Sequence, residues 1–368
     1  MIVISLYGRH RRKDHERILS NYIVVNNNKN ISVLDLYFIF NTFNKLKFKD
    51  SFLFLLFIMI SFLEKLGLEV KIICSDHFLV RRLKHTNNQF IREFILSRLM
   101  NVFYNDWREL EEYCEFSNVC FLGGGNDCFE QDSRFRVFPI FPAFHLKKRY
   151  ETRFTDRIFY VGKAHFDIKE LLKSHDKPLT SAAEKLVKEI SEKDFEQSSY
   201  KESLFFFPEI RNLSLQSERL LLVSFLRNTI RTSFFKQLAL SPLRKYTFVI
   251  GDELVEKFNF TGQKNNYNYK EVFSYMASSK INLDLGSQLL LGSFYSRSCD
   301  ILETSPYSLV QMEQKNAKEK YGLWSKTLTF DSFACFEELC EERFAANSDD
   351  FKKKSLHIRQ EIENNLLG

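Results

Sequence analysis

The chain has 368 residues, too many for one ordinary hydrophobic core and suited to two domains of about 150 residues each. A hydrophobic content of 44% with 27% charged residues excludes a disordered or fibrous chain. The formal net charge of +6 favours an anionic ligand, such as a nucleotide or phosphate, or an anionic membrane surface. Seven cysteines without a CxxC pair or zinc-site spacing indicate reduced thiols in a cytosolic protein.

The first half of the chain alternates strand and helix signals, which predicts a parallel sheet with helices on both faces. Its most apolar run, residues 51–63, is shorter than the ~20 residues that a membrane span needs, so we expect a buried crossover helix, with a lipid-contacting helix as the alternative. The expected elements are a strand at 2–6, helices at 32–43 and 46–66, a strand at 70–74, a helix at 87–104 and a strand from 118 that ends in a glycine turn.

A passage with prolines at 139–142, followed by a charge run, predicts a domain boundary near residue 150. The second half then repeats the alternating pattern. Its expected elements are a strand from 157, a helical insert at 166–200, a helix at 215–240, a strand at 246–253, a polar loop at 261–268, a helix and strand ending at 285, a helix opening near 293, a strand and helix at 326–347, and a final amphipathic helix.

The start of the chain reads as a strand followed by charge, and no signal peptide is visible. We therefore expect a cytoplasmic protein that is at most peripheral at the inner membrane face. No recognisable nucleic-acid-reading element is present, so nucleic acid is not an expected partner.

The stretch from residue 269 to 311 carries the clearest binding signal. After an apolar strand comes a turn with Gly286 and Gly292, and Ser293 is suited to cap the next helix. Arg297 and Asp300 follow at helical spacing on one face, where a guanidinium suits phosphate and a carboxylate suits ribose hydroxyls. The alternative is an ordinary surface pair of the two side chains.

Four segments of the second half, in this order, resemble the C-terminal domain of GT-B-fold glycosyltransferases, closest to the CgeB-like group. They are "FPAFHLKKRYETRFTDRIFYVGKAH", "KYTFVIGDE", "YKEVFSYMASSKINLDLGS" and "GSFYSRSCDILETSPYSLV". The resemblance covers roughly residues 139–345, and the first half matches only in its alternating pattern.

This resemblance implies an α/β protein with two Rossmann-like parallel-sheet domains in tandem and a ligand cleft between them. Residues 1–150 would form the acceptor side, 151–345 the donor side, and 346–368 a helix that packs back toward the N-terminal domain. The implied reaction moves a sugar from a nucleotide-sugar to a glycan, lipid-linked or protein acceptor, with no cofactor besides the donor. The expected donor-binding residues are Lys163, Arg231 (with Arg227 as its alternative), Ser293, Arg297 and Asp300.

An inverting mechanism needs a general base from the N-terminal domain, near the end of its first strand. His10, Asp14 and His15 are within reach of a loop at this strand end, as are Asp76 and His77 after the strand at 70–74. No Asp-x-Asp motif is present, so the sequence gives no reason to expect a metal site.

One departure from the resemblance concerns catalysis. The Glu-x₇-Glu pair of many retaining relatives is absent, because Gly292 stands eight residues before Asp300. The stereochemical outcome therefore stays open, and a non-catalytic nucleotide- or glycan-binding module on the same fold is the alternative function.

Overall fold

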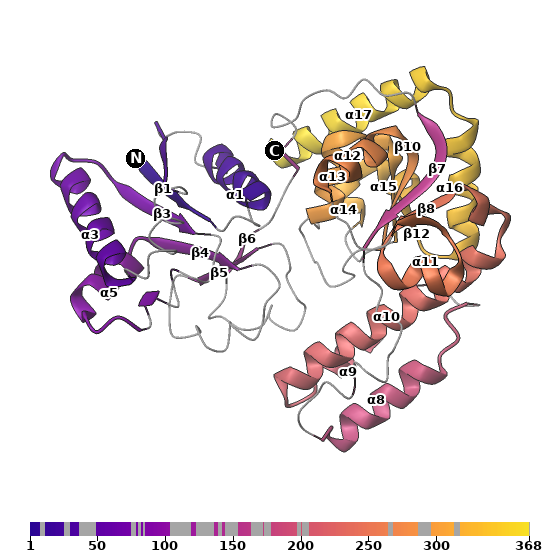
Figure 1. Ribbon diagram of the computed structural model, residues 1–368, viewed down its shortest axis with the longest axis horizontal. Coiled ribbons are helices and arrows are strands. Elements are labelled where there is room, and N and C mark those ends of the chain that lie inside the picture. The colour runs from indigo at the N-terminus through magenta and orange to yellow at the C-terminus, as the bar shows by residue number, and fades with distance from the viewer. Residues whose placement is uncertain are drawn as a thin grey trace. The chain divides into compact units, whose positions relative to one another are not determined.

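The computed structural model describes the chain apart from residues 8–11, 26–29, 37–48, 75–78, 80–81, 84, 104–118, 123–135, 139–141, 144–153, 163–171, 173–177, 197–199, 201–205, 264–267, 286–295, 313–316 and 368. Its contacts divide the chain into two compact units, drawn in Figure 1. The first consists of Met1–Gly125 with Phe129–Ala143, and the second of Asn126–Cys128 with Phe144–Gly368. The main division, after Ala143, falls close to the proline-containing passage.

The first unit is built on a sheet whose described strand pairs are all parallel, in the order β2-β1-β3-β4-β5-β6. A parallel sheet needs crossover helices between its strands, which matches the alternation in the sequence. The strands are β1 (Ile2–Leu6), β2 (Ser32–Asp35), β3 (Val70–Cys74), β4 (Leu99–Phe103), β5 (Val119–Leu122) and β6 (Arg136–Phe138). The helices include α1 (Arg12–Val25), α3 (Lys49–Lys65) and α5 (Gln89–Leu96).

Three expectations for this unit were wrong. A strand, β2, stands where a helix over 32–43 was expected, because Ser32–Asp35 pairs with β1. The helix expected over 87–104 ends at Leu96, and the residues after it form β4 alongside β3. The segment expected as a loop after the strand at 2–6 contains the start of α1 at Arg12. In the two strands, pairing with a distant partner overrides the local pattern.

Helix α3 was expected to be a buried crossover helix, but only one side of it is buried. Phe52, Leu56 and Ile60 are buried in the first unit, whereas Phe54 and Phe62 are exposed. Gly67 ends the segment with a φ of 77°, which a glycine adopts without strain. Among the described residues, no helix combines the length and apolarity needed to cross a membrane.

The second unit contains another parallel sheet, in the order β12-β11-β10-β7-β8-β9. Counted along the unit, this is the order 3-2-1-4-5-6 of a Rossmann-like fold, read from the other edge. The strands are β7 (Thr155–Val161), β8 (Thr247–Ile250), β9 (Thr261–Gln263), β10 (Ser279–Asp284), β11 (Leu309–Met312) and β12 (Thr329–Phe330). The helices are α8 (Ser181–Glu192), α9 (Phe206–Arg211), α10 (Gln216–Leu240), α11 (Asp252–Phe258), α12 (Tyr269–Ser278), α13 (Ser296–Thr304), α14 (Ala317–Tyr321), α15 (Ser325–Leu328), α16 (Phe333–Ala345) and α17 (Ser348–Leu367), with 3-10 turns η4 (Pro242–Tyr246), η5 (Pro306–Ser308) and η6 (Gly322–Trp324).

Strand β9 lies where a polar loop was expected. Gly262 allows it, because a Cβ atom at this position would stand 1.9 Å from the Val249 carbonyl oxygen of β8. Only a residue without a side chain lets the two backbones approach this closely.

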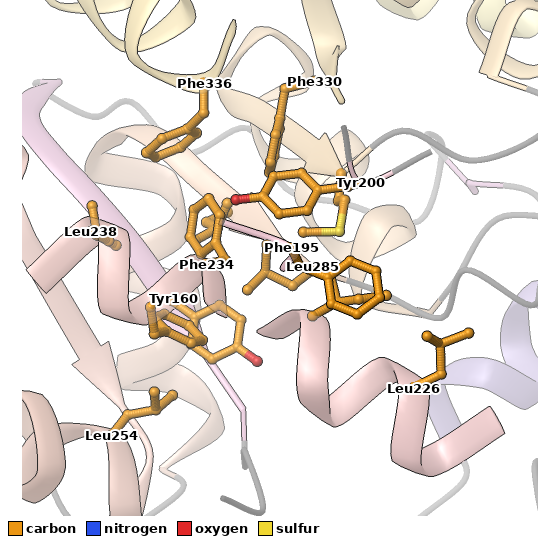
Figure 2. Close-up of a cluster of buried hydrophobic side chains, with 14 of the residues drawn as sticks. Tyr160, Phe195, Tyr200, Leu226, Phe234, Leu238, Leu254, Leu285, Phe330 and Phe336 are labelled. Atoms are coloured by element: carbon orange, nitrogen blue, oxygen red, sulfur yellow. The ribbon is translucent and has the colours of Figure 1, made fainter. Parts of the chain in front are cut away.

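The core of the second unit is strongly aromatic and lies between β7, β10, α10 and α16. Phe234 of α10 packs against Phe330 and Phe336, with ring centroids 5.6 and 5.0 Å away. Figure 2 shows these rings beside Tyr200. Among the described residues, eleven of the 39 phenylalanines belong to this core or pack against it.

The last helix, α17, belongs to the second unit by its contacts. Phe351 is fully buried and packs against Tyr307 and Phe154, with ring centroids 4.7 and 4.6 Å away. Lys354, one turn later, donates to the Tyr307 hydroxyl at 2.7 Å. The packing of this helix toward the first unit stays a prediction.

Candidate functional site

The strand order of the second sheet reverses direction between β7 and β10. From β7 the chain proceeds outward to β8 and β9, and from β10 it proceeds the other way to β11 and β12. In open parallel sheets, ligands bind beside the carboxyl ends of the strands at such a switch point. The register pairs Asn282 with Phe159, so three residues later Leu285 stands level with Gly162 at this edge.

Arg231 of α10 reaches this edge and is held there. Its Nε and Nη2 atoms donate to the Leu285 carbonyl oxygen at 3.1 and 2.9 Å. The side chain is 8% exposed, so its guanidinium lies beside the end of β10 in a largely desolvated position. Arg227, the alternative on the same helix, is partly exposed.

Arg297 of α13 reaches the end of the neighbouring strand. Its Cζ atom lies 5.5 Å from the Tyr160 ring centroid, a distance that allows a cation–π interaction. A Cβ atom at Gly162 would stand 3.1 Å from Arg297 Nη1 and 2.8 Å from the Tyr160 hydroxyl oxygen. The glycine therefore makes the space in which the guanidinium and the tyrosine meet.

The helices that carry the two arginines, α10 and α13, lie on opposite faces of the sheet. Tyr160 packs on Phe235 of α10, whereas Phe159, the residue before it, stacks on Tyr275 of α12. Successive side chains of a strand point to opposite faces, so α10 covers one face and α12 the other. Helix α13 contacts α12 and shares its face, as Figure 1 also shows.

A buried polar network anchors the start of α13. Asp284, the last residue of β10, accepts hydrogen bonds through Oδ2 from Ser298 Oγ and, at 3.0 Å, from Gln311 Nε2. Gln311 in turn accepts a hydrogen bond from the Tyr321 hydroxyl, and burial beside Asp284 raises the pKa of Tyr321 well above its ordinary value. Because Ser298 directly follows Arg297, this network fixes the turn that presents the arginine.

Two buried polar atoms at this edge have no hydrogen-bond partner within the described part of the chain. They are the Asp284 Oδ1 atom and the Tyr160 hydroxyl. Buried polar groups are usually satisfied, so such atoms point to water or to a ligand.

The remaining predicted donor residues are only partly described. Asp300 lies one turn after Arg297 on α13, as expected, but is 8% exposed. Its role toward a ribose therefore stays a prediction. Lys163 and Ser293 lie outside the described residues.

Of the predicted bases, His15 is the one whose side chain the structure describes. It lies on α1, is 1% exposed, and shares a hydrogen bond of 2.8 Å between Nε2 and Ser5 Oγ. Burial lowers its pKa from the ordinary 6.5 to about 4, and the nearby Asp35 carboxylate opposes this shift. His15 is thus neutral near pH 7, but its burial counts against direct contact with an acceptor.

The neighbours of His15 make a compact cluster at the end of β1. The Tyr7 ring stacks on the imidazole with centroids 4.7 Å apart, and its hydroxyl donates to Asp35 Oδ2 at 3.0 Å. Asp14 also lies on α1, but its side chain is outside the described part of the structure. His10, Asp76 and His77 are outside it as well.

Sequence reasoning missed Asp284, Gln311 and Tyr160. A signal for Asp284 exists: "SKINLD" alternates polar with apolar residues, yet all six residues are buried in a central strand. Polar side chains on a strand of this kind need partners, which indicates a polar network.

Among the described residues, no group of three or more His, Cys, Asp or Glu side chains is suited to hold a metal ion. Comparison of the chain with protein-family models, with curated proteins and with solved structures gives no match.

Proposed function

We propose that the carboxyl edge of the second sheet binds the diphosphate of a nucleotide-sugar, and that the protein transfers the sugar to a glycan, lipid-linked or protein acceptor. The observation that carries the proposal is that Arg231 and Arg297 reach the ends of the neighbouring strands β10 and β7, at the switch point of the sheet. A guanidinium offers a planar fork of donors that suits phosphate oxygens.

The choice of a nucleotide-sugar over other anions rests on the resemblance to GT-B-fold enzymes. The chemistry at the site is compatible with that choice. As the glycosidic bond breaks, the departing nucleotide diphosphate gains negative charge, and fixed cations at this position stabilise it. Positions for the sugar and for the acceptor stay predictions.

The experiment measures binding of UDP-, GDP-, CMP-, ADP- and TDP-linked sugars by thermal shift, since a ligand that binds the folded state raises the melting temperature. For the nucleotide-sugar that binds, Arg297→Ala is expected to weaken affinity roughly ten- to a hundredfold, because a charge-assisted contact is lost. The melting temperature without ligand should change little, because the side chain is only half-buried.

Arg244→Ala is the matched control. It removes the same charge from the same unit, at an exposed arginine whose described bond is to the Asn259 carbonyl oxygen. Equal affinities in wild type and Arg297→Ala, or equal losses in both variants, would contradict the proposed site.

The second candidate is nucleotide-sugar binding without transfer, and the buried position of His15 favours it. Release of free sugar from the bound donor over time distinguishes the two. Turnover that persists after Arg244→Ala and is lost in Arg297→Ala supports the enzyme, whereas tight binding without turnover supports the binding module.

A further inference from the structure

Helix α3 of the first unit leaves one of its faces apolar and exposed. Phe54, Ile58 and Phe62 follow one another at intervals of four residues, so they lie along one side of the helix. Leu55 and Leu66 lie on the same side by their spacing, and the five side chains are between 47% and 61% exposed. Single exposed apolar residues are ordinary, whereas a continuous row of this size marks an interaction surface.

The exposed row continues onto α5, which packs beside α3. Phe90 of α5 is 67% exposed, and its ring lies 5.6 Å from that of Phe57 on α3. We call Phe54, Leu55, Ile58, Phe62, Leu66 and Phe90 together the α3 patch.

The opposite side of α3 is fixed in the fold. Leu53, Leu56 and Ile60 are almost fully buried in the first unit. The helix has 17 residues, fewer than a membrane span needs. It can therefore meet an apolar phase only by lying flat, with the α3 patch as the contact surface.

The charges around the α3 patch favour an anionic partner. Glu64, the acid near the helix end, is neutralised by Arg98, whose Nε and Nη2 atoms donate to its carboxylate at 2.6 and 2.9 Å. Lys65 beside it is exposed. In the sequence, residues 44–85 contain eight Lys and Arg against four Asp and Glu, and Arg82 among them is buried.

We propose that the α3 patch binds the surface of an anionic lipid bilayer. Its aromatic and aliphatic side chains enter the boundary between headgroups and acyl chains, while the surrounding cations attract the lipid phosphates. An apolar row of phenylalanine, leucine and isoleucine on a helix with basic flanks is the pattern of an interfacial helix. The proposal does not depend on the transfer of a sugar.

The test is flotation of the full chain with phosphatidylcholine vesicles, with and without phosphatidylserine. The wild type is expected to float with the anionic vesicles and to be released by high salt in part. Phe62→Ser and the double variant Phe54→Ser/Ile58→Ser should each lower the bound-to-free ratio by roughly tenfold or more, because large apolar side chains no longer enter the bilayer. All three residues are exposed, so the melting temperatures of the variants should stay close to that of the wild type.

Leu323→Ser is the matched control, because Leu323 of the second unit is 88% exposed and stands apart from the α3 patch in the sequence. Flotation should be unchanged in this variant. The proposal is overturned if the wild type does not float, if Leu323→Ser weakens flotation as much as Phe62→Ser, or if the wild type is a dimer that Phe62→Ser separates without any binding to vesicles. The last result would show that a second copy covers the patch.

Discussion

Gly162 and Gly251 meet at the carboxyl edge of the second sheet, and their surroundings differ in one decisive way. A Cβ atom at Gly251 would stand 2.3 Å from the Gly162 carbonyl oxygen, which belongs to the backbone. A Cβ atom at Gly162 would instead meet the tips of Tyr160 and Arg297. Backbone atoms of packed strands cannot move aside cheaply, whereas side-chain tips can.

Gly251→Ala is therefore expected to lower the free energy of unfolding by about 1–3 kcal/mol, the usual cost of overpacking. Gly162→Ala strains its own backbone, because the φ of Gly162 is 159°, and it also displaces Arg297, so both the stability and the affinity for the nucleotide-sugar should fall. Gly251→Ala should lower stability but leave Arg297 and the affinity of the folded protein unchanged. Urea unfolding and ligand titration measure these two properties in both variants, and normal affinity in Gly162→Ala would show that Arg297 does not hold the ligand.

Two cations of the candidate site were named from the sequence, but the network that supports them was not. Arg297 was named from its place on a helix after a strand, and Arg231, with Arg227 as its alternative, was named from the resemblance to GT-B-fold enzymes. Asp284, Gln311 and Tyr321 come from three separate elements and meet only through the strand order. Hydrogen-bond partners of this kind depend on tertiary packing, which a local pattern does not encode.

Helix α17 illustrates how a single element is attached. Phe351 is fully buried between Tyr307 and Phe154, whereas Leu356 on the same helix is 54% exposed. Phe351→Ala should cost about 3–5 kcal/mol in the free energy of unfolding, as for other large-to-small changes in a core. Leu356→Ala should stay within about 0.5 kcal/mol of wild type.

Fluorescence of Trp324 provides the measurement, because η6 contacts α17. The chain has two tryptophans, and Trp107→Phe leaves Trp324 as the only one. Equal unfolding midpoints for the Phe351→Ala and Leu356→Ala variants would mean that α17 does not stabilise the second unit through Phe351.

Elements whose signal is local agreed with their sequence predictions. The strands at Ile2–Leu6 and Val70–Cys74 have the bounds that were predicted, and the helix at 215–240 starts one residue later. The strands β2, β4 and β9 were missed because their state depends on a neighbouring strand. Short segments are decided by pairing, while long periodic helices are decided by their own sequence.

The whole molecule consists of two units with separate cores, so we expect acid to affect them unequally. His15 of the first unit has a pKa of about 4 when folded and 6.5 when unfolded. Between these values the unfolded chain binds the proton and the folded unit does not. The free energy of unfolding therefore falls as pH falls through this window, by about 3 kcal/mol in total at 1.36 kcal/mol per pKa unit.

Trp324→Phe leaves Trp107, whose sequence position falls in the range of the first unit, as the reporter for this measurement. His15→Gln keeps a hydrogen-bonding group beside Ser5 but does not titrate, so its unfolding should depend less on pH between 6.5 and 4. In the Trp107→Phe variant, which keeps Trp324, the unfolding transition of the second unit should be the same with and without His15→Gln. An equally steep pH dependence in wild type and His15→Gln would assign the acid sensitivity to other groups.

The place of β7 in the middle of its sheet has a consequence during protein synthesis. Thr155 of β7 pairs with Ser279 of β10, so the first strand of the second unit leaves the ribosome long before one of its two neighbours exists. At 5–20 residues per second, this interval is on the order of ten seconds. Throughout it, one backbone edge of β7 lacks the strand that later pairs with it. A nascent chain halted before residue 279 should therefore expose an unpaired strand edge that is prone to aggregation. We expect chaperones to bind this chain preferentially, although its first unit is already fully synthesised.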